Sequence, residues 1–397
     1  MRPLVLSAYT ATSCLGRGLE ATRAALVEGR SGLRPCAFET VTLETHVGEV
    51  PGVDDEPLPA EFREFECRNN RLALLGLRQD GFDEAVRVLA HRLGPERIGV
   101  WLGTSTSGIL ETELAYRRRD PGSGALPADF RYRGAHNTAS VAGFVRRALG
   151  LEGPAAVISS ACSSSAKVFA SARRAIEAGL VDAAVVGGVD SLCLTTLYGF
   201  HSLQLVSHAP CRPFDAARDG LSIGEAAAFA LIERPGESLP AEAVLLLGTG
   251  ESSDAWHMSA PHPEGRGAAA AMRQALVAAR AAPGDIEYIN FHGTGTPSND
   301  AAEAQAVASV LGVATPGSST KGATGHTLGA AGGLEAVICA LALRHGLMPG
   351  GVNTTAVDPA LKVSYLRESR GASLGKVMSN SFGFGGSNCS LVLGRAG

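Results

Sequence analysis

Short, nearly continuous apolar runs recur along the chain and constrain its fold more than any other feature. They occupy residues 97–102, 155–159, 183–189, 226–232, 244–247 and 286–291. Strands that are buried on both faces have this appearance. Ala-rich segments typical of helices lie between some of these runs, at residues 164–178, 267–281, 300–311 and 329–344. The alternation predicts a layered α/β architecture in which helices pack on sheets.

The length and charge of the chain limit its domain number and its partners. Its 397 residues leave room for two or three domains or for one large α/β unit. Thirty-five Lys and Arg against 39 Asp and Glu give a net charge of -4, so the chain lacks the general positive field that would hold nucleic acid or an anionic membrane. Charged residues make up only 19%, less than the usual quarter or so. We therefore expect a large subunit interface.

Cysteine usage and hydropathy predict a soluble cytoplasmic protein. The eight cysteines lie far apart, with no pair at C-x-x-C spacing, which is typical of reduced thiols. No uninterrupted apolar run approaches the roughly 18 residues that a membrane span requires. The first apolar run breaks at Ser7, which favours a first strand over a signal peptide. We expect neither nucleic acid nor a membrane as a partner.

Two halves are visible in the chain. The polar stretch 233–241, which contains Pro235 and Pro240, predicts a boundary between an N-terminal half at residues 1–240 and a C-terminal half at residues 241–397. There is also a weak internal repeat, because the segments 160–165 and 320–326 each open a helix that ends at a glycine. Two copies of one unit would place these openings on equivalent edges of the core. Residues 44–70 carry mixed charges and several Pro, which predicts a surface excursion.

Cys162 is the first candidate for chemistry. It follows the apolar run 155–159 and precedes a helix of small residues. A cysteine at such a strand-to-helix turn projects from the sheet, and the helix N-terminus favours thiolate over thiol. This position indicates a nucleophile. The alternative is a buried structural cysteine.

His292 and His326 both lie at junctions rich in glycine. His292 ends an apolar strand and precedes the turn 293–297, and the carboxyl edge of such strands is where functional groups collect in α/β proteins. Glycines near His326 let a substrate or another backbone approach closely. The alternatives are structural histidines and a nucleotide-binding turn, although Ser298 replaces the third glycine of that fingerprint. Metal binding would have to use His257, His262, His292 or His326, and no pair of them has zinc-ligand spacing on a predicted helix face.

The segment 379–388 separates two strand-like runs and combines several glycines with two Phe. Its glycines leave backbone N–H groups available to an oxyanion, and the Phe side chains supply apolar cover. The alternative is a Gly-rich hairpin connection without a chemical role.

Taken together, these segments resemble the elongating β-ketoacyl-[acyl-carrier-protein] synthases of the thiolase-like superfamily. The resemblance runs over nearly the whole chain, through residues 160–162, 212–215, 218–220, 253–258, 292–297, 321–326 and 380–388. The Cys-His-His pattern argues against the initiating synthases, which use Cys-His-Asn. The resemblance implies the duplicated five-layer α-β-α-β-α fold, as a homodimer or as a heterodimer with a related ketosynthase-like subunit.

The resemblance also implies a decarboxylative Claisen condensation in two half-reactions. Cys162 would take an acyl group from an acyl carrier protein as a thioester. Malonyl-carrier protein would then lose carbon dioxide, and neutral His292 and His326 would stabilise its enolate. The backbone N–H groups of Cys162 and Phe384 would hold the oxyanion when the enolate attacks the acyl group. The product is a 3-oxoacyl-carrier protein. The acyl and malonyl substrates are attached to the phosphopantetheine of the carrier protein, and no metal or redox cofactor takes part.

Further roles follow from the same resemblance. Lys321 would support the site electrostatically, Glu335 would hold Lys321 or order the local network, and Phe384 would also gate the malonyl site. The residues expected to contact substrate are Thr294, Thr296, Ile109, Phe382, Gly383 and Gly385. We expect the acyl pocket near residues 104–109 and 137–144.

Arginines are the expected docking residues for an acidic carrier protein. Arg63, Arg68 and Arg71 correspond to this role, but Glu61, Glu64 and Glu66 dilute their charge. Arg117, Arg118 and Arg119 could form a replacement patch, or they could simply be solvated. A second departure is the segment 7–12, which lacks the glycine that the family commonly has in a turn there.

These departures favour a dedicated pathway over ordinary fatty-acid elongation. Such a pathway would be a type II polyketide or polyene route, for example to an aryl polyene. Two other functions remain open at this level. One is a non-catalytic partner like a chain length factor, although such partners lose the nucleophile. The other is a degradative thiolase that uses coenzyme A thioesters.

Overall fold

The computed structural model describes residues 2–55 and 57–396 and contains two sheets of the same design. The N-terminal sheet has the strand order β6 (Ala155–Ile158), β5 (Ile98–Gly103), β7 (Ala183–Asp190), β9 (Ala226–Glu233) and β1 (Leu4–Ser13). Strand β5 is parallel to both β6 and β7, whereas β9 is antiparallel to both β7 and β1.

The C-terminal sheet repeats this order and these directions. Its strands are β12 (Pro316–Ser318), β11 (Tyr288–Asn290), β16 (Lys376–Gly383), β17 (Ser387–Arg395) and β10 (Val244–Ser253), with β14 (Ser364–Tyr365) beyond β12. Strand β11 is parallel to β12 and β16, and β17 is antiparallel to β16 and β10. The two sheets join where Leu4 of β1 lies opposite Leu246 of β10. The matching topology is the structural basis of the internal repeat.

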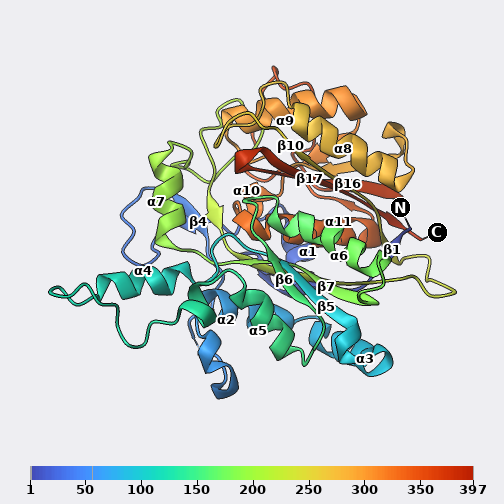
Figure 1. Ribbon diagram of the computed structural model, residues 1–397. Coiled ribbons are helices and arrows are strands. Elements are labelled where there is room, and N and C mark those ends of the chain that lie inside the picture. Colours follow the sequence, from blue (N-terminus) through green and yellow to red (C-terminus); the bar gives the residue numbers. More distant parts are fainter. Residues whose placement is uncertain (1, 56, 397) are drawn as a thin grey trace.

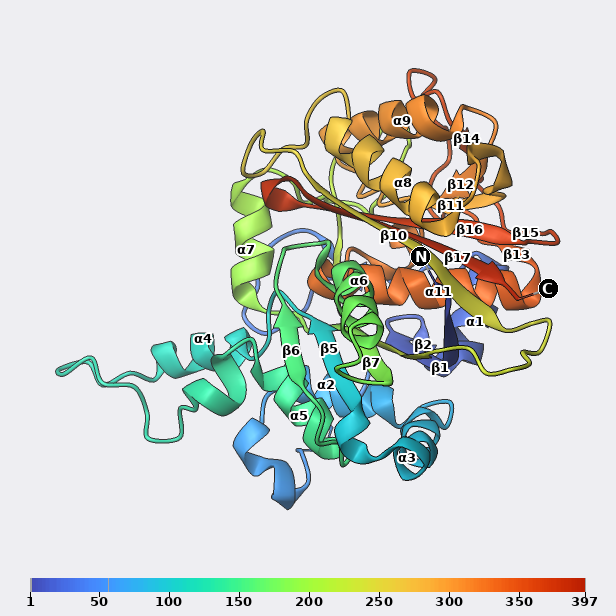
Figure 2. The ribbon, with the colours of Figure 1, turned by 45° about the vertical axis from the view of Figure 1, so that its right-hand side comes forward.

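Helices form the remaining layers (Figures 1 and 2). Helices α6 (Ser164–Glu177) and α11 (Ala331–His345) lie between the sheets and share one buried apolar cluster with strands of both. The outer face of the N-terminal sheet is covered by α2 (Arg68–Leu77), α3 (Phe82–Leu93) and α5 (Ser140–Ala148). That of the C-terminal sheet is covered by α8 (Arg266–Ala279) and α9 (Pro297–Leu311). The expected five-layer α-β-α-β-α fold is confirmed.

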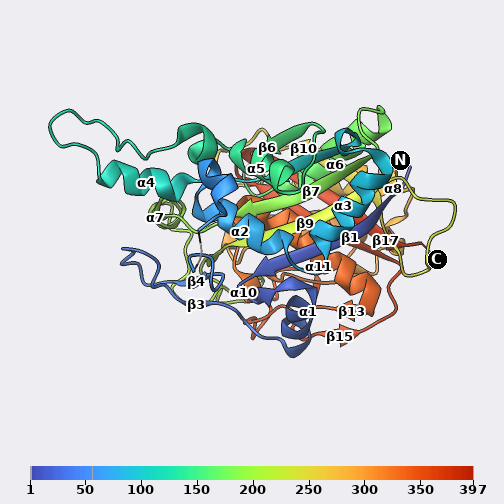
Figure 3. The same cartoon turned by 90° about the horizontal axis from the view of Figure 1, so that it is seen from below.

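Shorter elements connect these layers. They are β2 (Gly16–Arg17), α1 (Gly18–Glu28), β3 (Arg34–Pro35), β4 (His46–Gly48), η1 (Ala60–Phe65), η2 (Pro95–Arg97), α4 (Ile109–Arg117), η3 (Tyr132–His136), α7 (Leu194–Ser202), β8 (Ile223–Gly224), η4 (Pro283–Asp285), α10 (Lys321–Thr324), η5 (Leu328–Ala330), β13 (Leu347–Met348), β15 (Arg370–Gly371) and η6 (Phe384–Gly386). Helix α4 and the loop after it stand off from the body as an arm, which is clearest from below (Figure 3).

Helix α11 explains why the chain has such an apolar helical segment. The stretch Leu328–His345 is long and apolar enough to cross a membrane by composition, with a mean hydropathy of 1.3, but 89% of it is buried inside the protein. A helix between two sheets meets apolar neighbours on every side, so it needs no polar face. Its composition is therefore weak evidence for a membrane span.

Two local expectations were wrong. The segment 7–12 is not a turn, because it lies inside β1 and continues its pairing with β9 past a bulge. Residues 44–70 are not a surface excursion throughout, because Val47, Val50 and Val53 are buried and β4 pairs with β8. In both segments, contacts with distant strands outweigh the local polar pattern.

Candidate active site

The two helix openings that repeat in the sequence meet at one place in the fold. Cys162 lies between edge strand β6 and α6, and Lys321 lies between the corresponding strand β12 and α11. Because α6 and α11 are neighbours in the central layer, their N-terminal ends bring the two openings together. The duplication itself therefore builds the site.

The turn before Cys162 is tightly held. Ala161 adopts a left-handed backbone conformation with φ 53°, which is uncommon for a residue with a side chain and needs support from its surroundings. The Ser164 hydroxyl donates to the Ala161 carbonyl at 2.5 Å and accepts from the Ser160 N–H at 2.9 Å. These contacts fix the backbone that carries Cys162, whose sulfur lies 2.9 Å from His326 Nε2.

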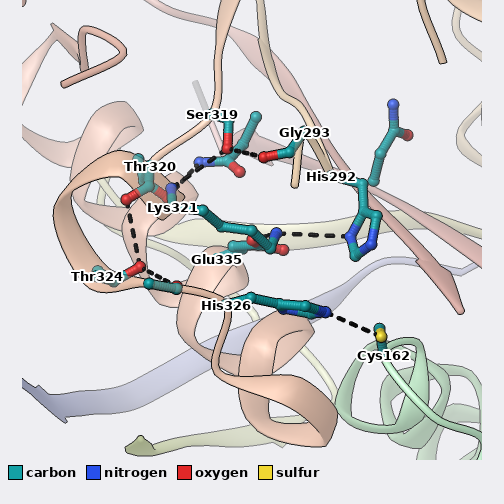
Figure 4. Close-up of polar contacts among 12 residues, drawn as sticks. Cys162, His292, Gly293, Ser319, Thr320, Lys321, Thr324, His326 and Glu335 are labelled. Carbon is teal, nitrogen blue, oxygen red and sulfur yellow. Dashed lines mark hydrogen bonds and ion pairs between the residues drawn. The ribbon is translucent and has the colours of Figure 1, made fainter. Parts of the chain in front are cut away.

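The side chains of Cys162, His292 and His326 point toward one another (Figure 4). His326 Nε2 lies 2.9 Å from Cys162 Sγ. The rings of His292 and His326 meet edge to face with centroids 5.3 Å apart. All three residues are buried. A thioester carbonyl bound at the cysteine can therefore be reached by both imidazoles.

Lys321 and Glu335 form a buried ion pair beside the histidines. Lys321 Nζ pairs with Glu335 Oε1 and lies 3.5 Å from His292 Nδ1. Each charge offsets the cost of burying the other, so neither could be removed alone without penalty. Because an ammonium group can only donate, it makes His292 Nδ1 an acceptor and leaves the ring proton on Nε2.

Burial and the Lys321 charge decide the protonation of the site. Burial lowers the pKa of His292 and of His326 well below the ordinary value, and Lys321 lowers both further. Both imidazoles are therefore neutral at neutral pH. Burial also raises the pKa of Cys162 to about 11, although Lys321 and the Phe384 N–H act in the opposite direction. Burial therefore favours the thiol over the thiolate in the resting site.

The β16–β17 hairpin supplies the second wall of the site. The Phe384 backbone N–H lies close enough to the Cys162 sulfur to lower the pKa of its thiol. Gly383 passes so close to the Cys162 turn that a Cβ there would lie 2.9 Å from the Ser160 carbonyl oxygen and 3.2 Å from the Cys162 nitrogen. The segment is thus a Gly-rich hairpin connection, and it also places a donor N–H where an oxyanion at Cys162 would need one.

A cavity opens at the triad, and it contains most of the residues expected to contact substrate. Thr294, Thr296, Phe382 and Gly383 line it together with the triad and Phe384. Two expected residues do not reach it. Ile109 begins α4 and packs against a separate apolar cluster. Gly385 is exposed in the hairpin turn, where its φ of 76° suits glycine.

Glu303 is a site residue that the motifs did not reveal. This buried carboxylate on α9 accepts the His292 N–H at 2.8 Å and the Gly293 N–H at 2.7 Å, and the Asn380 side chain donates to it at 3.2 Å. Burial raises its pKa to about 7. Glu303 thereby orients the loop that carries His292. A lone Glu in an otherwise Ala-rich helix was the available signal, and Glu335 shows the same pattern.

Arg68 was wrongly predicted to dock a carrier protein. Its side chain is only 2% exposed and forms a buried ion pair with Glu225 at 2.7 Å, so it has no surface to offer. Arg71 is held by Asp54 and Glu66.

The other docking candidates lie at the surface. Arg63 is exposed on η1. On the arm, Arg117 donates to the Thr40 hydroxyl, Arg118 pairs with Asp129, and Arg119 is exposed. Their use in docking stays a prediction.

The triad is also compact enough to raise the question of a metal ion. The ligand atoms of Cys162, His292 and His326 lie within 4.8 Å of one another. However, the Lys321 ammonium lies against His292, and its charge opposes a second cation there. The site fits an acyl-transfer centre better than a metal centre.

Comparison with known proteins decides the family. The model of the β-ketoacyl synthase N-terminal domain matches residues 1–237, and that of the β-ketoacyl synthase C-terminal domain matches residues 243–355. The chain belongs to the β-ketoacyl synthase family. This synthase is 33% identical to the mitochondrial 3-oxoacyl-[acyl-carrier-protein] synthase of Arabidopsis thaliana, over 98% of this chain and 93% of the relative. It is 32% identical to 3-oxoacyl-[acyl-carrier-protein] synthase 2 of Coxiella burnetii, over 99% of both chains.

Solved structures agree with this assignment. A chain from the complex of the ketosynthase ApeO with its chain length factor ApeC, from Xenorhabdus doucetiae, is 40% identical with a TM-score of 0.89, covering 100% of this synthase and 98% of that chain. A chain of the ishigamide ketosynthase/chain length factor is 28% identical with a TM-score of 0.90, covering 100% of both. The expected class, an acyltransferase that forms 3-oxoacyl-carrier protein, is confirmed.

Proposed function

We propose that this synthase condenses a Cys162-bound acyl group with malonyl-carrier protein in a dedicated type II polyketide or polyene pathway, together with a related subunit. The observation that carries the catalytic part is the 2.9 Å contact between Cys162 Sγ and His326 Nε2, beside a second neutral histidine. The reaction needs a nucleophile, two neutral donors and an oxyanion site, and the cavity holds all four.

The first half-reaction is acyl transfer to Cys162. Its thiol is protonated at rest, so attack on the acyl-pantetheine thioester must be accompanied by loss of the thiol proton. His326 Nε2 lies at the sulfur and can pass this proton to the departing pantetheine sulfur. The N–H groups of Cys162 and Phe384 hold the oxyanion of the tetrahedral intermediate. A new carbon–sulfur bond forms at Cys162, and the carrier leaves as a free thiol.

The second half-reaction makes the carbon–carbon bond. Malonyl-carrier protein loses carbon dioxide, and the electron pair of the broken bond moves onto the thioester oxygen. His292 can stabilise this enolate by donating from Nε2, which is the tautomer that Lys321 imposes on it. His326 donates beside it once its ring proton has moved from Nδ1 to Nε2. The enolate carbon then attacks the acyl-cysteine, and the Cys162 sulfur leaves as a thiolate. It takes up one proton from solvent, which balances the negative charge of the carboxylate that left as carbon dioxide. The carrier departs with a 3-oxoacyl chain.

A second subunit is supported by the open edge of the N-terminal sheet. Within residues 2–55 and 57–396, β6 pairs only with β5, and its residues are partly exposed. An unpaired strand edge offers backbone groups to another chain. The two solved neighbours come from ketosynthase and chain length factor assemblies, which supports a related subunit over a second copy.

The free cysteines of the structure fit a reducing compartment such as the cytoplasm.

Intact-mass spectrometry tests this proposal. We expect wild-type synthase to gain the mass of an acyl group from an acyl-carrier protein, and Cys162→Ala to gain none. Donors of several chain types should be compared, because the best donor separates fatty-acid supply from polyene supply. Each donor should be tried with and without the candidate partner subunit. Failure of every donor in the presence of that subunit would contradict the catalytic proposal and favour a binding subunit.

A further inference from the structure

Asp190 is a buried carboxylate next to the site that the condensation chemistry leaves without a role. It ends β7, and its side chain is fully buried. Unlike Lys321 and Glu335, it has no cationic partner within hydrogen-bond distance among residues 2–55 and 57–396. Its hydrogen bonds come instead from backbone N–H groups and hydroxyls on two separate turns.

The first turn follows β5 and leads into α4. Asp190 Oδ1 accepts the Thr104 hydroxyl at 2.6 Å, the Thr106 N–H at 2.9 Å and the Thr106 hydroxyl at 2.9 Å. The Ser105 N–H donates to the same oxygen at 2.8 Å. This turn belongs to the N-terminal half and ends at Ile109, which packs outside the cavity at Cys162. We call it the acyl-side turn because the sequence predicts the acyl pocket near residues 104–109.

The second turn belongs to the C-terminal half and follows His326. Asp190 Oδ2 accepts the Gly329 N–H at 2.5 Å. Only Thr327 and Leu328 separate this contact from His326, whose ring touches the Cys162 sulfur. One carboxylate therefore holds the acyl-side turn mainly with Oδ1, with the Ser105 N–H also 3.0 Å from Oδ2, and holds the His326 turn with Oδ2.

Both turns contain a residue with a strained backbone conformation, and the hydrogen bonds to the Asp190 carboxylate are needed to hold these conformations. Ser107 has φ 44° and Leu328 has φ 52°, a left-handed conformation that side chains disfavour and that persists only when neighbours enforce it. The Ser107 N–H is held by the Thr104 hydroxyl oxygen at 3.0 Å, and that hydroxyl donates to Asp190. Leu328 precedes Gly329, which donates to the same carboxylate. Removal of one acceptor would free both turns to relax.

We infer that Asp190 is a positioning residue that couples the acyl-side turn to His326. The position of the His326 imidazole against Cys162 then depends on the same carboxylate that holds the turn before α4. The inference rests on the proposed function for its meaning in catalysis. Its geometry is independent of which acyl chain is bound. Asp190 acts through His326 and does not touch Cys162 itself.

The Asp190→Asn variant tests the inference, because an amide keeps the shape of the side chain but turns one acceptor into a donor. The amide NH2 group of the asparagine must then lie against either the Gly329 N–H or the N–H and hydroxyl donors of the first turn, and neither can accept its hydrogen bond in the present arrangement. A displaced imidazole loses the reacting geometry, and a displacement of about 1 Å costs on the order of 100-fold in rate. We expect kcat of condensation to fall by about this factor, while KM for malonyl-carrier protein changes less than about threefold.

Asp215→Asn is the matched control. Asp215 is also buried and accepts the N–H groups of Thr355, Ala356 and Ala217 at 2.7, 2.9 and 2.8 Å, but it holds no turn of the site. We expect both variants to lower the melting temperature and only Asp190→Asn to lower kcat. An equal loss of kcat in both variants, or none in Asp190→Asn, would overturn the inference.

A second readout separates this inference from the proposed function. Alkylation of Cys162 by iodoacetamide needs no carrier protein, and the charges that act on this thiol are Lys321 and Asp190, of which Asp190 raises its pKa. We expect the pH midpoint of alkylation to move down in Asp190→Asn and to stay in Asp215→Asn, even if wild-type protein condenses no substrate. An unchanged midpoint would contradict the close coupling of Asp190 to the site.

If Asp190→Asn does not fold, Thr106→Val provides the milder variant, since it removes only the hydroxyl that donates to Asp190 Oδ1. We expect it to lower kcat by about threefold or more with little change in KM. An unchanged kcat in folded Thr106→Val would overturn the coupling.

Discussion

Lys321 adds to the effect of burial on the protonation of the site through its charge. It lowers the pKa of both histidines, and it is balanced by Glu335 alone among the acidic side chains in hydrogen-bond contact with it. The condensation needs neutral imidazoles, because only a neutral ring combines a donor N–H with a nitrogen that can accept a proton. At the scale of residues, the activity of the histidines therefore depends on a lysine that never needs to touch the substrate.

Replacement of Lys321 by Met should shift the pH dependence of condensation. Without the ammonium, the histidine pKa values rise toward the ordinary value of about 6.5. The histidines then become charged at a higher pH as the solution is acidified, so the acid limb of the pH–rate profile moves to higher pH. Steady-state rates between about pH 5 and 8 measure this shift. An acid limb that stays in place would contradict the role given to Lys321.

The same variant should be unstable, and a double variant provides its control. Lys321→Met leaves Glu335 buried without a partner, which costs about 3–5 kcal/mol. Combining it with Glu335→Gln removes both charges and should recover most of this loss in chemical denaturation. Equal stability of the single and double variants would show that the pair is not coupled.

Sequence motifs located the reacting residues. They did not show which charged side chains are buried in ion pairs with partners far away in the sequence. Cys162, His292 and His326 stand in local motifs, so their positions were predictable. Arg68 looked like a surface cation because its buried partner, Glu225, lies 157 residues away in the chain. Glu303 and Asp190 had no motif at all. Local sequence carries the chemistry, whereas burial and pairing arise only in the fold.

At the scale of elements, the β16–β17 hairpin must pass the Cys162 turn without a side chain. Gly383→Ala would place a Cβ 2.9 Å from the Ser160 carbonyl oxygen, which forces the hairpin and the Phe384 N–H away from the sulfur. We expect acylation of Cys162 to slow by about tenfold or more, since loss of one oxyanion donor costs at least this much. Time-resolved intact-mass measurements check it.

Gly199→Ala is the control for the hairpin variant. Gly199 lies on α7, and a Cβ there would meet nothing within 4 Å. Its acylation rate should match wild type. A Gly383→Ala variant that acylates at the wild-type rate would show that the hairpin does not support the oxyanion.

The arm formed by α4 and the following loop is the second element with a testable role. Reversal of Arg117, Arg118 and Arg119 to Glu should weaken binding of an acidic carrier protein, because docking of opposite charges is steered electrostatically. Titration at low salt measures the affinity. Arg87→Glu on the exposed face of α3 is the control, and it should leave the affinity unchanged. Unaltered affinity in the triple variant would refute this use of the arm.

Elements were predictable where the apolar pattern was long, and less so where pairing is long-range. Strands β5, β7 and β9 and helices α6, α8, α9 and α11 agree with the apolar runs and Ala-rich segments within a few residues. Strand β1 continues through a segment that looked like a turn, since its ladder partners on β9 hold it extended. Strand β4 was missed for the same reason, because its partner β8 lies far along the chain.

At the scale of the whole molecule, the described part of the chain leaves strand β6 as an open edge of the N-terminal sheet, and only 19% of the residues in the sequence are charged. Ala156 is exposed on the edge strand β6. Ala156→Lys should therefore reduce assembly with a second subunit, because a charge on a strand edge opposes pairing. Light scattering of the purified protein or of the co-expressed pair measures this. Ala282→Lys, at an exposed position away from this edge, is the control, and equal assembly in both variants would contradict an interface at β6.

The internal repeat explains which parts of the duplicated fold could be predicted from the sequence and which could not. The two helix openings at residues 160–165 and 320–326 were recognisable because each combines small residues with a reactive side chain. The equal strand order of the two sheets was not, since corresponding strands share only apolar character. Their meeting in the central layer, which creates the site, becomes visible only when both halves are folded together.

A single-turnover experiment on the acylated synthase shows whether Cys162 and the two histidines carry out both half-reactions. Acylated synthase, freed of the donor and with any required partner subunit present, is mixed with malonyl-carrier protein, and the intact masses of both proteins are followed. We expect the acyl mass to disappear from Cys162 while a 3-oxoacyl chain, two carbons longer than the acyl group, appears on the carrier. We expect Cys162→Ala to form no such product. An acyl-enzyme that persists unchanged, or a 3-oxoacyl product formed equally by Cys162→Ala, would contradict it.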